Sequence, residues 1–317
     1  MSKLEVSHLK KYYPTSDGVL HAVDDVSLRV EAGQTVGVVG ESGCGKSTLG
    51  KTILRLTEPT AGSVKLDGTE ITELSPRELK RYRTRMQMIF QDPFSSIDPR
   101  MTVSQLIAEP FHIHRITRDR AEIAERVRSI METVGLDKRF ENSYPHELDG
   151  GRRQRIGVAK ALALDPEFIV CDEPVSALDV SIQAQILNLL QDLQEDKRLT
   201  YMFITHDLSV VRHISNRICV MYLGQVIEQC ETEELFENTL HPYSQALLSA
   251  IPIPRVDDRP PRILLTGEVS SPIEPEDRCR FAPRCRFCTE ECRQRPAPEL
   301  KDVGNGHLVA CHRVGEI

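Results

Sequence analysis

The segment Gly40–Thr48 constrains the fold of this chain more than any other part of its sequence. The apolar run 35–39 before it favours a strand, and the run 47–54 at its end favours a helix. Its residues fit the pattern G-x-x-x-x-G-K-S/T and are Gly40, Glu41, Ser42, Gly43, Cys44, Gly45, Lys46, Ser47 and Thr48. Glycines in such a loop let the backbone wrap a phosphate, while amides at the helix N-terminus point at the anion. We therefore expect an α/β fold that binds a nucleoside triphosphate, with Lys46 on the β- and γ-phosphates and the Ser47 hydroxyl on Mg²⁺.

A second apolar run, 168–171, ends in the two carboxylates Asp172 and Glu173. It is short and β-branched, as is typical of a strand buried on both faces of a parallel sheet. Asp172 would hold Mg²⁺, usually through water, and Glu173 would be the general base that orients and deprotonates the attacking water. Taken alone, an Asp-Glu pair before a proline is more typical of a turn. Its combination with the phosphate loop indicates hydrolysis of the nucleotide.

Length and composition limit the classes of protein to which the chain can belong. Its 317 residues allow more than one domain, and a net charge of −7 argues against a general nucleic-acid binder. The N-terminus has no apolar region typical of a signal peptide, and no run approaches the roughly eighteen apolar residues of a membrane span. A role in transport would therefore need separate membrane subunits. Nine cysteines without an export signal suggest a reducing compartment, in which clustered cysteines bind metal more often than they form disulfides.

Periodicity divides the first two thirds of the chain into strands and helices. The runs 4–9 and 26–30 alternate like strands, and 86–90 is an apolar strand. From about 92 to 163 the sequence predicts helices joined by polar loops, so a helical subdomain is inserted between the phosphate loop and the Asp-Glu strand. Apolar residues at three- and four-residue steps over 182–193 predict an amphipathic helix.

The last third contains a strand, a hairpin and a cysteine-rich tail. A strand at 200–205 ends at His206, and a hairpin is expected to turn near Gly224. Proline then becomes frequent, which predicts a linker. We expect a nucleotide-binding domain over 1–250, followed by the linker and a cysteine-rich C-terminal extension over 251–317.

The order of these elements resembles the ATP-binding subunits of ABC transporters. Gln91, at the end of a strand, resembles the Q-loop glutamine that touches Mg²⁺, and 176–179 resembles the D-loop. His206 resembles the switch histidine that contacts the γ-phosphate. Tyr13 matches the aromatic position that stacks on adenine, and Tyr12 is a close rival. Taken alone, such a glutamine is typical of a turn and such a histidine of a helix start.

The resemblance covers about residues 1–250 and implies a particular fold. That fold is a P-loop ABC-type ATPase with a mixed sheet core, an antiparallel β subdomain and the helical subdomain. The implied cofactors are ATP and Mg²⁺, and the implied activity is ATP hydrolysis.

The resemblance narrows to the ATPases that drive uptake of di- and oligopeptides. The segments that carry it are 86–94, 99–103, 241–248 and 267–268, while the loop version 43–50 resembles the second ATPase of such importers. The resemblance implies a heterodimer with a second, related ATPase beneath two membrane permease subunits, on the cytoplasmic face of the cell membrane. An extracytoplasmic binding protein would deliver the peptide. Related importers carry nickel or glutathione, so these ligands stay open.

Two other classes of function stay open. A soluble ABC-type ATPase that acts on nucleic acid or ribosomes usually carries coiled-coil insertions or two ATPase halves, and this acidic chain has one half. A structural subunit would bind ATP without turnover, and Glu173 argues against that.

The chain departs from the family at its signature sequence, Leu-Ser-Gly-Gly-Gln. Here Gly150 and Gly151 match, but Asp149 replaces the serine and Arg152 the glutamine. In the family this segment binds the γ-phosphate held by the partner's phosphate loop. A serine hydroxyl can donate to that phosphate and an ionised aspartate cannot. One hypothesis is an asymmetric dimer in which the site at Asp149 turns over slowly; in the other, Asp149 caps its helix, Arg152 supplies the donor and both sites work.

The tail contains five clustered cysteines. They are Cys279, Cys285, Cys288, Cys292 and Cys311. Four thiolates bind zinc or an iron–sulfur cluster, and spacing alone does not decide between them. The resemblance to peptide-importer ATPases implies a 4Fe–4S cluster on Cys279, Cys285, Cys292 and Cys311, with Cys288 spare or an alternative ligand. Zinc and free thiols or disulfides remain the alternatives. A role in stability fits better than electron transfer.

Overall fold

The chain folds into two compact units. The computed structural model describes residues 2–92, 97–251, 262–267 and 270–316. The helical unit consists of 31–33 and 73–202, and the sheet unit consists of 2–30, 34–72 and 203–317. Parts of three predicted features lie outside the described residues, namely the proline-rich segment 252–261, Pro93 with Phe94, and Glu268.

The N-terminal strands of the sheet unit form an antiparallel sheet. Its strands are β1 (Ser2–Thr15), β2 (Gly18–Glu31), β4 (Ala61–Leu66) and β5 (Thr69–Glu70), in the order β2-β1-β4-β5. On β1 and β4, Leu4 lies opposite Leu66 and Val6 opposite Val64. Alternate side chains of a strand point to one face, so these four apolar residues are buried together. The two strands predicted near the N-terminus are confirmed.

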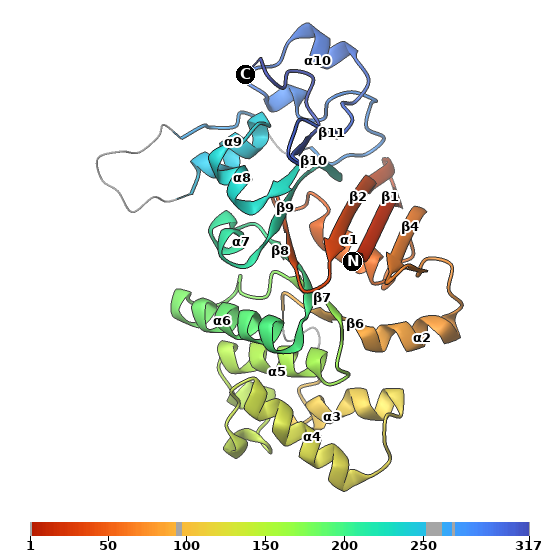
Figure 1. Cartoon of the computed structure of the whole chain (residues 1–317), viewed down its shortest axis with the longest axis vertical. Coiled ribbons are helices and arrows are strands. Elements are labelled where there is room, and N and C mark those ends of the chain that lie inside the picture. Colours follow the sequence, from red (N-terminus) through yellow and green to blue (C-terminus); the bar gives the residue numbers. More distant parts are fainter. Residues whose placement is uncertain (1, 93–96, 252–261, 268–269, 317) are drawn as a thin grey trace. The chain divides into compact units, whose positions relative to one another are not determined.

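A second sheet of the sheet unit has mixed strand directions (Figure 1). Its strands are β3 (Thr35–Val39), β9 (Arg217–Tyr222), β10 (Gln225–Glu231), β12 (Leu308–Val309) and β11 (Lys301–Asp302). β3 pairs parallel to β9, whereas β9 with β10, β10 with β12 and β12 with β11 are antiparallel. The predicted hairpin is confirmed, because the chain turns between β9 and β10 at Leu223 and Gly224, both with positive φ. β8 (Thr200–Thr205) begins in the helical unit, ends in the sheet unit and is wholly buried.

The C-terminal segment packs into the core of the sheet unit. The helices of this unit are α1 (Lys46–Ile53), α7 (Leu208–Ile214), α8 (Thr232–Glu237), α9 (Pro242–Ser249), α10 (Glu290–Gln294) and the 3-10 turn η4 (Ala282–Arg284). Figure 1 shows α8 and α9 beside β10. The Tyr222 ring of β9 lies 4.7 Å from that of Tyr243 on α9 and 5.3 Å from that of Phe281, between centroids. Because all three rings are buried, the 279–285 turn is part of this core.

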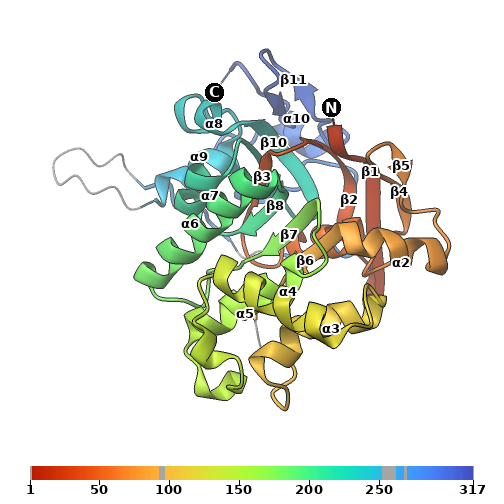
Figure 2. The same cartoon turned by 60° about the horizontal axis from the view of Figure 1, so that its bottom comes forward.

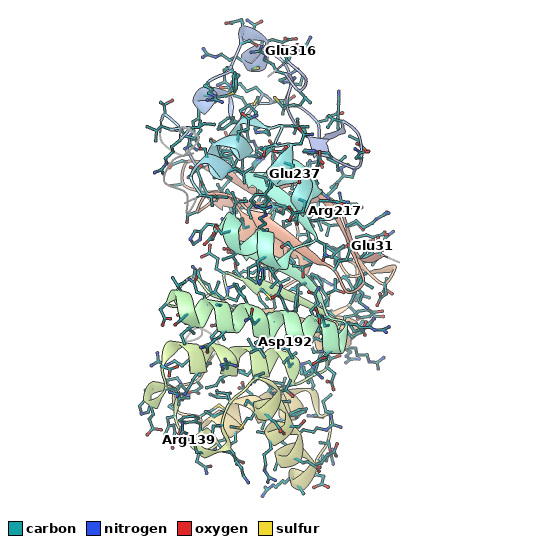
Figure 3. The ribbon with its side chains drawn as sticks, turned by 60° about the vertical axis from the view of Figure 1, so that its left-hand side comes forward. Glu31, Arg139, Asp192, Arg217, Glu237 and Glu316 are labelled. Atoms are coloured by element: carbon teal, nitrogen blue, oxygen red, sulfur yellow. The ribbon has the colours of Figure 1, made fainter. Side chains whose placement is uncertain are left out.

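The helical unit packs helices beside a pair of parallel strands. Its strands are β6 (Met86–Ile89) and β7 (Phe168–Asp172), and its helices are α2 (Pro76–Arg85), α3 (Val103–His114), α4 (Arg120–Thr133), η2 (Lys138–Phe140), η3 (Pro145–Glu147), α5 (Gly150–Leu162) and α6 (Val180–Lys197). Figure 2 shows α3, α4 and α5 grouped together. In Figure 3, α6, marked by Asp192, lies alongside α5. The predicted amphipathic helix is confirmed as α6, which buries Ile186, Leu190 and Leu193.

None of the helices in the described part of the chain combines the length and the apolar character that crossing a bilayer requires.

Candidate functional site

The phosphate loop follows β3 directly and is closely packed by the rest of the sheet unit. A Cβ on Gly45, where φ is 105°, would lie 2.0 Å from the Ala22 carbonyl oxygen. A Cβ on Gly40 would lie 2.3 Å from the Met221 carbonyl oxygen. Both contacts are far inside van der Waals distance, so only glycine fits at these two positions.

The loop ends in helix α1. Gly45 is the N-cap residue, and no side chain of the described residues caps this helix. Amides in the first turn of a helix carry the positive end of the helix dipole and suit an anion. The Lys46 ammonium donates to the carbonyl oxygens of Gly40, at 2.8 Å, and Glu41, at 2.9 Å. The side chain expected to bind phosphate is therefore buried against the loop itself.

Two residues far along the sequence hold the loop at Glu41. The Glu41 amide donates to the Tyr243 hydroxyl at 2.8 Å. The Arg284 guanidinium donates to both carboxylate oxygens of Glu41, at 2.6 and 3.0 Å. This hydrogen-bonded pair raises the pKa of Arg284, so the guanidinium stays charged. Sequence reasoning assigned no role to Tyr243 or Arg284, because their contacts with Glu41 join segments that are far apart in the sequence.

The two candidate tyrosines of β1 have different surroundings. The Tyr12 ring stacks on His21, with 3.9 Å between centroids, and its hydroxyl donates to Asp24. Burial and this hydrogen bond raise the pKa of Tyr12. The Tyr13 ring has the Lys11 ammonium 4.6 Å from its centroid. Tyr12 is therefore engaged through both its ring and its hydroxyl, and Tyr13 through its ring.

His206 lies in the sheet unit between β8 and α7. The next residue, Asp207, is the N-cap of α7 and accepts from the Ser209 amide at 2.8 Å. The Asp207 amide donates to the Thr205 hydroxyl at 3.1 Å. These bonds fix the backbone on the C-terminal side of His206, whose side chain is exposed.

The helical unit brings Gln91 and Glu173 together. β6 and β7 run parallel, with Ile89 opposite Cys171, so the residues that follow them meet at one edge. There the Gln91 amide nitrogen donates to a Glu173 carboxylate oxygen at 2.9 Å. Asp172 at the end of β7 is buried, and Glu173 has a positive φ of 45°. Such a backbone conformation is strained for a non-glycine residue and is common at functional sites.

In the altered signature segment, the start of helix α5 is capped by a residue of the segment itself. Asp149 is the N-cap of α5 and accepts from the Arg152 amide at 2.8 Å. The Arg152 guanidinium also binds the Asp149 carboxylate, at 2.5 Å. A Cβ on Gly151 would lie 2.7 Å from the Ile182 side chain, so this glycine permits close packing of α5 on α6. Asp149 therefore caps its helix, as one of the two hypotheses from the sequence expects.

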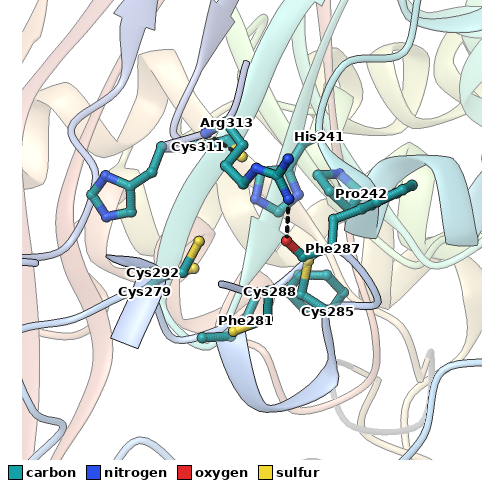
Figure 4. A pocket seen from close by; sticks show the side chains of 12 residues that line it. His241, Pro242, Cys279, Phe281, Cys285, Phe287, Cys288, Cys292, Cys311 and Arg313 are labelled. Atoms are coloured by element: carbon teal, nitrogen blue, oxygen red, sulfur yellow. Dashed lines mark hydrogen bonds between the residues drawn. The ribbon is translucent and has the colours of Figure 1, made fainter. Parts of the chain in front are cut away.

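The five clustered cysteines of the sheet unit line one cavity of about 20 Å³ (Figure 4). Burial raises the pKa of Cys279 to about 11 and raises that of Cys285 and Cys311. The described residues contain no group of three or more His, Cys, Asp or Glu side chains arranged to hold a metal ion. The other four cysteines, Cys44, Cys171, Cys219 and Cys230, are buried.

Comparison with known proteins agrees with this fold and with the loop. A family model described as "ABC transporter" matches residues 23–176, and one described as "Oligopeptide/dipeptide transporter, C-terminal region" matches residues 227–292. The putative oligopeptide transport ATP-binding protein YkfD of Bacillus subtilis (strain 168) is 50% identical over 98% of this chain and 94% of its own length. The oligopeptide transport ATP-binding protein AppF of the same organism is 49% identical over 98% of this chain and 96% of its own length.

Solved structures show the same class of protein. The ATP-binding cassette MJ0796, in a dimeric post-hydrolysis state bound to ADP and Pi, is 30% identical and has a TM-score of 0.66. The match covers 72% of this chain and 98% of that chain. Together with the phosphate loop, this similarity defines an ATP-hydrolysing cassette with a mixed sheet, an antiparallel sheet and helices, as predicted.

The chain belongs to the ABC transporter family, as an ATP-binding protein that carries the C-terminal region of oligopeptide and dipeptide transporters. The alternative of a soluble ATPase for nucleic acid or ribosomes is not favoured by these relatives.

Proposed function

We propose that this chain is the ATP-hydrolysing motor subunit of an importer of di- or oligopeptides. The observation that carries the proposal is similarity over almost the whole chain. The relatives YkfD and AppF, named as oligopeptide transport ATP-binding proteins, align with 98% of it. Residues 1–250 would form the ATPase domain, and 251–317 the linker and the cysteine-rich C-terminal extension.

The phosphate loop would hold the triphosphate and its magnesium ion. Lys46, buried against the loop carbonyls, would bind the β- and γ-phosphates. Ser47 and Asp172 would place Mg²⁺, with Gln91 as a further ligand. Oxygen donors of this kind are the ligands that Mg²⁺ prefers.

Glu173 would activate the attacking water as a general base. Its hydrogen bond to Gln91 supports this role, because it links the base to a residue expected at the magnesium ion. His206 would contact the γ-phosphate, and Tyr13 would stack on adenine.

The subunit would act within a larger assembly. A second, related ATPase would pair with it as a heterodimer, and two permease subunits would form the passage through the membrane. An extracytoplasmic peptide-binding protein would deliver the ligand. The chain would then lie on the cytoplasmic face of the cell membrane as a peripheral subunit.

The two nucleotide sites of that heterodimer would differ. The site with this chain's Lys46 and Glu173 would meet the partner's signature and hydrolyse ATP. The other site would meet this chain's Asp149, Gly150 and Gly151. Two like charges about 4 Å apart repel by about 4 kcal/mol at an effective dielectric constant near 20, and Arg152 would offset part of this.

The substitution Glu173→Gln tests the proposed function. In the assembled transporter we expect ATP turnover to fall by about 10²- to 10⁴-fold, the range for loss of a general base. ATP affinity should stay within a few-fold, because the amide keeps the size of the side chain. Glu195→Gln on the exposed surface of α6 is the control and should leave turnover unchanged. Full turnover in the Glu173→Gln transporter would refute the assignment.

Coupling to peptide needs its own measurement. We expect peptide-loaded binding protein to stimulate ATP hydrolysis by the transporter in liposomes. Stimulation by nickel or glutathione instead would reassign the ligand, and stimulation by none of them would argue against an importer.

We also propose that Cys279, Cys285, Cys292 and Cys311 hold a 4Fe–4S cluster. The donor chemistry fits, because thiolates are the usual ligands of such clusters and these sulfurs surround one cavity. A cavity of about 20 Å³ has room for about one water, so the sulfurs would separate to admit the cluster. The raised thiol pKa values mean that metal binding would release protons. The group would stabilise the C-terminal extension.

Metal analysis tests this cluster. Anaerobically purified protein should contain about four irons and absorb near 400 nm. Cys292→Ser should lose the iron, and the control Cys288→Ser should keep it if Cys288 is spare. Equimolar zinc without iron would reject the cluster.

A further inference from the structure

The turn between Cys279 and Cys285 reaches the phosphate loop. Arg284 in this turn forms a two-pronged ion pair with Glu41, the second residue of the loop. The two side chains are 7% and 27% exposed, so solvent screens the pair weakly. Paired hydrogen bonds between a guanidinium and a carboxylate fix orientation as well as distance. The loop is thus held by a residue 243 positions away in the sequence.

The surroundings of Arg284 hold its guanidinium in place. Its guanidinium carbon lies 5.9 Å from the centroid of the Tyr222 ring. That ring packs against Phe281 of the same turn and against Tyr243. Tyr243 in turn accepts a hydrogen bond from the Glu41 amide, so one aromatic cluster holds Glu41 through both backbone and side chain.

A second arginine of the same turn holds the other side of the loop. Arg280 pairs with Asp24 and donates to the Leu223 carbonyl oxygen. The Asp24 amide donates to the carbonyl oxygen of Gly224 at 2.8 Å, and the Gly224 amide donates to that of Cys44 at 2.8 Å. Cys44 lies within the phosphate loop. Arg280 therefore supports the loop through the backbone of the turn at Leu223 and Gly224.

Charge gives the contact at Glu41 a second effect. A carboxylate within an anion-binding loop opposes the binding of a triphosphate. Arg284 neutralises this carboxylate and turns it toward the 279–285 turn. Loss of Arg284 would release the loop and also leave a negative charge in it.

We infer that Arg284 is a positioning residue for the phosphate loop, so that ATP affinity depends on the 279–285 turn of the C-terminal segment. The inference rests on the proposed role of Gly40–Thr48 in binding ATP. Arg284 acts through Glu41 and does not itself touch the nucleotide.

Equilibrium binding of ATP to the full-length chain tests the inference. We expect Arg284→Gln to weaken ATP binding about tenfold, within the roughly 5- to 150-fold range of couplings between sites. Arg284→Lys keeps the charge but not the paired geometry and should give an intermediate loss. The control is Arg278→Gln, which removes an exposed pair with Glu276 from the same segment and should change nothing.

A double-mutant cycle separates coupling from damage to the fold. In a Glu41→Gln background, the further change Arg284→Gln should alter ATP affinity less than about twofold, because its partner charge is gone. An unchanged tenfold loss in that background would mean that Arg284 does not act through Glu41. Should Arg284→Gln fail to fold, Arg284→Lys and Glu41→Gln provide the same comparison. If Lys46→Ala loses ATP binding while the Arg284 variants bind normally, the inference about Arg284 is overturned and the assignment of the loop stands. Normal binding by Lys46→Ala would overturn the loop assignment instead.

Discussion

The phosphate loop and the altered signature segment both begin a helix, but their helix starts are completed in opposite ways. No described side chain caps α1 after Gly45, whereas the Asp149 carboxylate caps α5. Amides at a helix start suit an anionic ligand, whereas a carboxylate cap accepts from one of these amides and adds negative charge. Among the described residues, the chain therefore has one helix start without a side-chain cap and one that carries a carboxylate cap.

The two regions also differ in what supports them. Glu41 is held by Tyr243 and Arg284, more than 200 residues away, whereas Asp149 is held by Arg152, three residues away. Local sequence is enough to build the signature segment. The phosphate loop in this form needs the C-terminal part of the sheet unit as well.

The largest effect is expected from a substitution that disrupts the phosphate loop and so weakens ATP binding. Gly45→Ala would place a Cβ 2.0 Å from the Ala22 carbonyl oxygen at a φ of 105°. We expect ATP binding to weaken by more than about 100-fold, which is about 2.7 kcal/mol. The matched control is Gly157→Ala in α5, where a Cβ meets nothing within 4 Å and alanine favours the helix. Equal ATP affinity in the two variants would show that the packing around Gly45 does not shape the site.

The next largest effect is expected from a substitution that restores the family's serine in the signature segment. Asp149→Ser removes the charge and keeps a side chain that caps helices well. We expect ATP hydrolysis at the site that meets residue 149 to become about tenfold faster in the assembled transporter, since like-charge repulsion of up to about 4 kcal/mol is partly offset by Arg152. Asp119→Ser, at the N-cap of α4, is the matched control and should leave the rate unchanged. An unchanged rate and unchanged nucleotide occupancy in the Asp149→Ser transporter would remove the idea of asymmetry.

The smallest effect concerns the support of the C-terminal part of the sheet unit. His307 is buried and bonds Glu228 at 2.9 Å and Glu234 at 3.3 Å. Burial alone lowers the pKa of His307, but the hydrogen bonds and charges of Glu228 and Glu234 raise it on balance. The protonated pair therefore stabilises the fold fully below about pH 6.5, and this stability is lost as pH rises through the raised folded pKa.

Urea unfolding of the wild type and of His307→Gln measures this pH-dependent contribution of His307 to the stability of the fold. We expect a difference in unfolding free energy of about 1 kcal/mol at pH 6 that shrinks toward pH 9. A difference that stays constant or grows with pH would contradict the assignment.

Sequence reasoning found the features that depend on local pattern. The strand–loop–helix around Lys46, the hairpin at Gly224 and helix α6 follow from residue type and periodicity. The bond between Gln91 and Glu173 needed the parallel register of β6 and β7, which neither strand specifies alone. The pair between Glu41 and Arg284 was not predictable, because it depends on how two distant segments pack on one aromatic cluster.

One measurement tests the central contrast most directly. The assembled transporter would be loaded with two labelled ATP molecules, and hydrolysis would be followed through a single turnover. If one half-site is intact and the other carries Asp149, one ATP should be hydrolysed quickly and the second at least about tenfold more slowly. Hydrolysis of both ATP molecules at one rate would contradict the proposed difference between the two sites.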